Sequence, residues 1–230
     1  MIGASRHLVA LGVLAAIGAC GDNRAAVPAD AVDHDAASPD ASAPDAFVDA
    51  RQDAPLDGAP GDAAACVTTT EAFPLAAGTH VPVCSGVTYP TNPPTSGAHY
   101  PVWAKYQAYS APVSRPFWVH DLEHGAVVVS YNCPAGCDAE VAALIAYLDA
   151  RPADPLCTAP VRNRFVVTPD PLLDTTFAAS AWGFALRSTC FDLPALGAFI
   201  DAHYAHAPEN LCADGVDVLD PASGIPPNCP

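Results

Sequence analysis

Three histidines and two carboxylates gather between Pro93 and Tyr131, and these are residue types that bind metal ions. His99 closes the segment PPTSGAH, and the segment HDLEH carries His120 and His124 with both acidic residues between them. On a helix, side chains four residues apart lie on one face, so the two imidazoles of HDLEH can reach one ion. On an extended strand they would lie roughly 13 Å apart, which is too far.

A metal site in this segment therefore requires a helical turn before the apolar run that starts at Ala126. Ser114 as the N-cap, Pro116 in the first turn and Gly125 as the stop permit such a turn. Three neutral imidazoles with an open position suit zinc or copper, and a nearby carboxylate can hold a ligand in place by a hydrogen bond. The expected ligands are His99, His120 and His124, with Asp121 or Glu123 as the supporting carboxylate.

Two other interpretations of the same residues stay open. The pattern H-x-x-E-H matches the inverted zinc-protease motif, in which Glu123 would activate a metal-bound water as a general base. That match is short, and the domain is small for that class of peptidase, so an enzyme is the less favoured interpretation. The histidines could also be structural and bond backbone carbonyls that fix the PPTSG loop against the following strand.

The N-terminus predicts export. Residues 1–19 combine a basic start, an apolar run too short to span a bilayer and small residues at the end, which is typical of a secretory signal peptide. The ending Ile17-Gly18-Ala19-Cys20 resembles the lipobox of bacterial lipoproteins. This resemblance implies cleavage before Cys20 and lipid attachment to its sulfur. We therefore expect a lipoprotein of the cell envelope, anchored to the membrane at the outer membrane or facing the periplasm.

Residues 20–65 are rich in alanine, aspartate and proline. We expect a disordered tether here, because such a composition cannot bury enough apolar surface to offset the entropy of ordering. The chain carries a formal net charge of -16, which argues against nucleic acid as a partner, since phosphate binding needs a basic face. Much of this acidity belongs to the tether and says little about the folded domain.

The cysteines indicate disulfides. With Cys20 assigned to the lipid, eight of the nine cysteines remain, and an even number in an exported domain indicates four bridges. Eight cysteines allow 105 pairings, and as first guesses Cys66–Cys84 and Cys212–Cys229 would each close a flanking segment. The candidates are Cys66, Cys84, Cys133, Cys137, Cys157, Cys190, Cys212 and Cys229.

One pair of cysteines has an alternative use. Cys133 and Cys137 could form a redox or metal pair, although three residues separate them and thioredoxin-like motifs have two. The oxidising compartment favours a structural bridge.

Hydrophobic periodicity predicts an α+β domain. The β-branched run Ala126–Tyr131 indicates a buried strand, and Val161–Thr168 and Phe177–Leu186 indicate two more. Asp138–Ala150 and Leu193–Tyr204 have apolar residues at helical spacing, and Asp138 is a candidate N-cap. This order predicts a small mixed sheet with two packed helices.

The folded part begins near Cys66 and runs to Pro230, and its length suits one domain. Between Cys66 and Cys84 we expect a strand, a turn and a second strand, followed by a short strand at Val87–Tyr89. The prolines and glycine of PPTSG exclude a regular helix there. We expect the aromatic residues of 102–118 mainly in the core, with the lining of a ligand pocket as their other use.

Taken together, these motifs resemble the bacterial domain-of-unknown-function family 3105. The resemblance rests on PPTSGAHYP, VHDLEHGAVVVSY and AWGFAL…FDLPALGAFIDAHYAHAPE, and it covers roughly Val81 to Glu209. It implies an exported or membrane-anchored bacterial protein and brings no established activity. The many cysteines and the long tether depart from the usual family pattern. The motif positions are Pro93, Pro94, Thr95, Ser96, Gly97, His99, His120, Glu123, His124 and Gly125.

The sequence thus predicts a lipid-anchored, disulfide-stapled α+β domain that binds zinc or copper through a histidine cluster. The alternative is a non-catalytic envelope module with structural histidines, whose aromatic segment meets a protein or small-molecule partner. A zinc-dependent hydrolase is the third hypothesis.

Overall fold

A five-stranded mixed sheet with strand order β1-β5-β4-β2-β3 is the framework of the fold. The computed structural model describes residues 65–227 and 229–230. Strands β2 and β3 run parallel, and the other neighbouring pairs run antiparallel. The strands are β1 (Thr68–Ala72), β2 (Val127–Tyr131), β3 (Phe165–Pro169), β4 (Phe177–Ala181) and β5 (Phe184–Ser188). The α+β class with a mixed sheet is confirmed.

In the described part of the chain three α-helices pack around this sheet, where the sequence led us to expect two. They are α1 (Arg115–Glu123), α2 (Asp138–Asp149) and α3 (Leu193–His203), and a 3-10 turn follows at Pro221–Ser223. The additional helix is α1, the helical turn that the metal hypothesis required before β2. Ser114 is its N-cap residue, but the Ser114 hydroxyl donates to the backbone oxygen of Pro230 and caps no amide. Asp138 is the first residue of α2 and Cys137 is its N-cap, which corrects our prediction.

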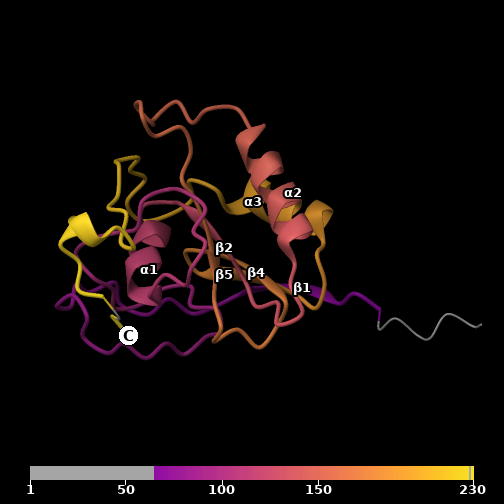
Figure 1. Cartoon of the computed structure of the whole chain (residues 1–230), viewed down its shortest axis with the longest axis horizontal. Coiled ribbons are helices and arrows are strands. Elements are labelled where there is room, and N and C mark those ends of the chain that lie inside the picture. The colour runs from indigo at the N-terminus through magenta and orange to yellow at the C-terminus, as the bar shows by residue number, and fades with distance from the viewer. Residues whose placement is uncertain (1–64, 228) are drawn as a thin grey trace, which may run out of the picture. The chain divides into compact units, whose positions relative to one another are not determined.

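Alternate residues of β2 face opposite sides of the sheet, as in any extended strand. Val128 belongs to the hydrophobic cluster that includes Trp118 of α1. Val127 and Val129 belong to a second cluster, with residues of α2 and α3. In Figure 1, α2 and α3 lie together and α1 lies apart from them. Because β2 is covered on both faces, it begins with three consecutive valines, Val127 to Val129, and shows no alternation of apolar and polar residues there.

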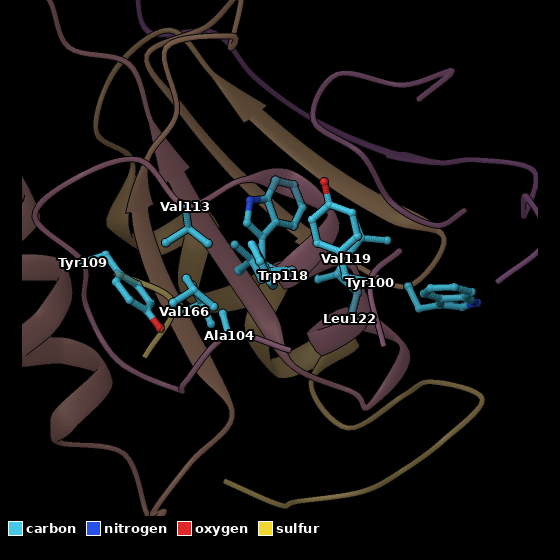
Figure 2. Close-up of a cluster of buried hydrophobic side chains, with 12 residues drawn as sticks. Tyr100, Ala104, Tyr109, Val113, Trp118, Val119, Leu122 and Val166 are labelled. Atoms are coloured by element: carbon cyan, nitrogen blue, oxygen red, sulfur yellow. The ribbon is translucent and has the colours of Figure 1, made fainter. Parts of the chain in front are cut away.

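The cluster on the α1 side holds much of the aromatic segment. Figure 2 shows Trp118 and Leu122 of α1, Val166 of β3, and the loop residues Tyr100 and Tyr109 packed together. All five are buried. The expectation that the aromatic residues of 102–118 serve mainly as core is therefore right for Tyr109 and Trp118. Their packing holds α1 against the sheet.

Two predicted strands have different bounds in the structure. The run 177–186 is a hairpin of β4 and β5, because Gly183, with φ 81°, turns the chain between them. The strand predicted from Val161 begins only at Phe165. The reason is that Arg164 turns its guanidinium into a buried ion pair with Asp154, while the amide of Val161 closes a turn on Thr158.

The segment before the PPTSG loop is mostly irregular. Only β1 forms between Cys66 and Cys84, and no second strand follows it; Val87–Tyr89 is not a strand either. Pro74 and Pro82 have no amide hydrogen to give to a ladder, which explains why pairing stops. Isolated backbone hydrogen bonds instead join the irregular segment to the rest of the fold, for example from the amide of Phe73 to the carbonyl of Gly183.

Eight cysteines form four disulfides, as predicted, but neither guessed pairing is present. Cys66 precedes β1 and Cys190 follows β5, so the antiparallel register that aligns Thr68 with Ser188 also brings these two sulfurs together. Two other bridges, Cys84–Cys229 and Cys157–Cys212, join residues that are far apart in the sequence. The fourth bridge, Cys133–Cys137, is local.

Candidate metal centre

Three histidines and one glutamate come together at one end of α1. One possible ligand atom from each of His80, His99, His120 and Glu123 lies within 4.8 Å of the other three. We call these four residues the inner group. His99 and His120 are buried, Glu123 is partly buried and His80 is exposed. Imidazole nitrogens and a carboxylate oxygen in this number are a donor set for a transition metal ion.

The backbone brings His80 and His99 together. These two residues form an isolated parallel bridge. The amide of Val81 donates to the carbonyl of His99 at 2.9 Å, and the amide of His99 donates to the carbonyl of Thr79 at 3.0 Å. The irregular segment before the loop is thus held against the loop end, and its histidine becomes a neighbour of His99.

The PPTSG loop is buried and is held in place by hydrogen bonds to other segments. Its buried residues are Pro93, Pro94, Thr95, Ser96 and Gly97. The Thr95 carbonyl accepts a 2.9 Å hydrogen bond from the amide of Gly183. The Ser96 hydroxyl oxygen accepts one of 2.9 Å from the amide of Ala76. The loop residues therefore position His99, and the Ser96 hydroxyl takes part through its bond to Ala76.

Helix α1 supplies the other two members of the inner group. His120 and Glu123 are three residues apart and so share one face of the helix. The helix ends at Glu123, and Gly125 follows with φ 87°. A Cβ atom at Gly125 would lie 2.9 Å from the guanidinium of Arg164 and 3.0 Å from the Cα atom of Ala205, so only glycine fits this turn.

The His99 ring has one nitrogen in use and one facing a carboxylate. Its Nδ1 atom lies 2.8 Å from the carbonyl oxygen of Gly97, which accepts the ring proton there. Its Nε2 atom lies 3.0 Å from Oε2 of Glu123, is buried and has no hydrogen-bond partner among the residues that the structure describes. In the neutral ring, two lone pairs therefore face each other. A cation between them would satisfy both.

The His120 ring is arranged in the same way. Its Nδ1 atom lies 2.7 Å from the carbonyl oxygen of Tyr100, so the second nitrogen is free to act as a ligand. Burial, and after it the neighbouring His124, lower the pKa of His120 to about 3, against the bond to Tyr100. The ring is therefore neutral at ordinary pH, which is the form that binds metals.

His124 lies beside the inner group and is not a member of it. Its ring centroid is 4.5 Å from that of His120, and Trp103 packs edge-on against both rings. Its Nε2 atom faces Oε2 of Glu209 at 3.4 Å. The structure thus brings together two of the three predicted ligands, His99 and His120, and places His124 next to them.

Of the two predicted supporting carboxylates, Glu123 lies in the inner group and Asp121 does not. Neither carboxyl oxygen of Asp121 has a hydrogen-bond partner among the described residues. Burial raises the pKa of the Asp121 carboxyl well above its usual range, although the backbone of Ala104 opposes the shift. No contact with a site histidine supports the predicted role of Asp121.

His80 was missed in the sequence analysis, because no spacing rule links a histidine in an irregular segment to this motif.

The four disulfides indicate that the domain belongs to an oxidising compartment outside the cytosol. Across residues 65–227 and 229–230, no helix is long and apolar enough to cross a membrane. The predicted signal peptide, Cys20 and the tether of residues 20–65 fall almost wholly outside the described residues.

Comparison with known proteins gives a family match and no named relative. Residues 80–214 match the family described as Protein of unknown function (DUF3105). The match begins at His80 and contains every residue of the inner group. No curated protein matches the chain. No solved structure matches it either.

Proposed function

Because the chain belongs to the DUF3105 family, whose description assigns no activity, we propose its function from the site alone: the domain binds a transition metal ion, zinc or copper. The ligands are His80, His99, His120 and Glu123. The observation that carries this proposal is the buried contact between Nε2 of His99 and Oε2 of Glu123, which are 3.0 Å apart without a hydrogen bond.

The spacing of the donor atoms supports an ion of this class. Zinc binds imidazole nitrogens at about 2.0–2.1 Å, so neighbouring ligand atoms of a tetrahedral site lie roughly 3.4 Å apart. The inner group spans at most 4.8 Å between its ligand atoms. Loading therefore needs only a small contraction. Carbonyl oxygens at 2.8 and 2.7 Å already fix the His99 and His120 rings through Nδ1, as second-layer partners do in metal sites.

The exposure of the ligands indicates how an ion would arrive. His80 is exposed, whereas the side chain of Glu123 is 13% exposed and that of His99 is fully buried. An ion would reach the buried donors past His80, which is the last ligand to close over it. We further propose that this domain works in the cell envelope, attached to the membrane through lipid on Cys20, as the N-terminal sequence predicts.

The metal content of the purified full-length chain tests the proposal. The protein is dialysed against zinc or copper and then against buffer, and metal is measured by elemental analysis beside His99→Gln and Glu123→Gln variants. We expect about one tightly held equivalent in the parent and a large loss in both variants. His206→Gln is the matched control, because His206 is exposed and bonds only its own helix end. A parent protein without metal would refute the proposal.

A further inference from the structure

A second histidine–carboxylate pair lies beside the inner group. The Nε2 atom of His124 is 3.4 Å from Oε2 of Glu209, and the rings of His120 and His124 are 4.5 Å apart between centroids. The proposed metal centre uses neither His124 nor Glu209. Their contact resembles that between His99 and Glu123, in which a ring nitrogen also faces a carboxylate oxygen without a hydrogen bond.

The backbone holds this second pair in place. The amide of Glu209 donates to the carbonyl of Glu123 at 3.0 Å, and the amide of Leu211 donates to the carbonyl of His124 at 3.2 Å. The same His124 carbonyl accepts a 2.8 Å bond from the guanidinium of Arg164. The segment at Glu209 therefore runs along the end of α1, and the backbone keeps the two pairs adjacent.

The ring of His124 is unsatisfied in the protein itself. Its side chain is 3% exposed, and within residues 65–227 and 229–230 its buried Nδ1 atom has no hydrogen-bond partner. A buried imidazole with no hydrogen bond is uncommon, since buried polar groups nearly always find a partner. Trp103 covers the ring edge-on at 4.7 Å and keeps it beside His120. A metal ion would bind the other ring nitrogen, Nε2, which faces the carboxylate of Glu209.

The separation within the pair fits two neighbouring ligands on one ion. Ligand atoms at about 2.0–2.1 Å from zinc lie roughly 3.4 Å apart at a tetrahedral angle, and the His124–Glu209 separation is 3.4 Å. The same ion would have two protein ligands, with water completing its coordination. The carboxylate of Glu209 is 58% exposed, so the position opens directly to solvent.

We propose that His124 and Glu209 form a second position for a divalent zinc or copper ion, adjoining the inner group. This inference rests on the proposed function, because it assigns a neighbour to that centre. The second position is the weaker one. It has two protein ligands, and the His124 ring lacks the carbonyl bond that orients His99 and His120. An ion held there exchanges with solvent and stands next to His120, so this position is also a second entry to the centre.

Calorimetric titration of the full-length protein with zinc tests this, together with electron paramagnetic resonance of the copper(II) form. We expect two binding events in the parent, one tight and one weaker, and magnetic coupling between two copper ions at full loading. Glu209→Gln should abolish the weak event, raising its Kd at least tenfold, and remove the coupling while leaving the tight event. Glu209 is exposed, so this variant does not depend on repacking the core. His124→Gln should give the same pattern.

Controls separate this proposal from the first one. Asp174→Asn and His206→Gln remove an exposed carboxylate and an exposed imidazole elsewhere, and both should keep two events. A single tight event in the parent, or two events retained in Glu209→Gln, would overturn the second position and leave the inner group standing. No binding event in the parent would overturn both.

Discussion

The Nε2 atom of His99 and the Oε2 atom of Glu123 lie 3.0 Å apart in a buried contact, yet they share no hydrogen bond. When the neutral His99 ring donates a hydrogen bond from Nδ1 to the carbonyl of Gly97, its Nε2 is an acceptor that faces another acceptor. Without a cation this arrangement is unfavourable, because the buried lone pair of Nε2 has lost its water and gained no donor. With a cation it becomes half of a coordination sphere. Substitutions at the residues that hold this contact in place should therefore have measurable effects.

Gly78 controls the position of the Glu123 carboxylate. A Cβ atom added at Gly78 would overlap Oε1 of Glu123 and lie 3.2 Å from the indole of Trp182. In Gly78→Ala the flexible carboxylate should move away, so metal affinity should fall roughly 10- to 100-fold, the range seen when ligand support is lost. Competition titration with a chelating dye measures this change.

A matched glycine provides the control. A Cβ atom added at Gly86 would have no atom within 4 Å, so Gly86→Ala should keep the parent affinity. Equal affinities for the Gly78→Ala variant and the parent would show that Glu123 is not a ligand.

The buried state of His120 predicts how stability depends on pH. Its pKa is lowered by burial to about 3 from an ordinary value of 6.5. Between these values the unfolded chain takes up a proton that the folded protein refuses, so the stabilising contribution is present above pH 6.5 and is lost as the pH falls. The metal-free parent should therefore lose free energy of unfolding more steeply than His120→Gln, by up to roughly 1.4 kcal/mol per pH unit.

Urea unfolding at a series of pH values from 7 to 4 measures this difference. Asp121, whose pKa is raised by burial, contributes with the opposite sign, and His124, whose pKa is lowered mainly by burial, contributes with the same sign. Both are present in parent and variant, so their effects cancel to first order in the comparison. Parallel pH profiles would show that the His120 ring is not held neutral by the fold.

The four disulfides should differ in what they add to stability. Cys133 and Cys137 are 4 residues apart, whereas Cys66 and Cys190 are 124 apart. A bridge that closes a longer loop removes more entropy from the unfolded chain. Replacing both cysteines by serine should cost roughly 2 kcal/mol for the short loop and roughly 5 kcal/mol for the long one. Denaturant unfolding of the two double variants checks the order, and a larger loss at Cys133–Cys137 would contradict it.

Arg164 should contribute strongly to the stability of the fold at the end of α1. It is fully buried, pairs with Asp154 at 2.7 Å and donates to the carbonyl of His124 at 2.8 Å. Burial alone would raise the pKa of Asp154, but hydrogen bonds from Tyr204 and the guanidinium hold it below its usual range. Arg164→Met leaves that carboxylate buried and unpaired, so we expect a loss of roughly 3–5 kcal/mol.

The double variant Arg164→Met/Asp154→Leu tests the cause of that loss. Removing both charges together avoids an unpaired buried carboxylate, so it should recover part of the stability in the same denaturant assay. No recovery would show that Arg164 acts through its other bonds, including the one to His124.

The elements of this fold were largely readable from the sequence, because their patterns are local. The apolar run before Tyr131 predicts β2, and the helical turn needed to bring His120 toward its neighbours is α1. The hairpin at Gly183 was missed, because residues 177–186 (FAASAWGFAL) are nearly all apolar and look like one continuous strand. The disulfide partners were missed because they follow strand register, as Cys66 and Cys190 do.

The candidate site was predictable only in part, because some of its residues lie in local motifs and others are brought in by tertiary contacts. His99 and His120 stand in recognisable motifs, whereas His80 joins them through a backbone bridge between two irregular segments. The four-residue spacing of His120 and His124 predicts one shared face. Helix α1 ends at Glu123, and this residue, three positions after His120, joins the inner group. The ligand set with His124 stays a prediction, now with a neighbouring role for that residue.

The most direct test is an anomalous difference map from crystals grown with zinc and measured at the zinc absorption edge. We predict a peak at about 2.0–2.1 Å from the Nε2 atoms of His99 and His120 and from a carboxylate oxygen of Glu123, with His80 closing over it. A map without a peak between His99 and Glu123, from protein that is folded and zinc-saturated, would contradict the central claim. The 3.0 Å contact between them would then be a structural pair.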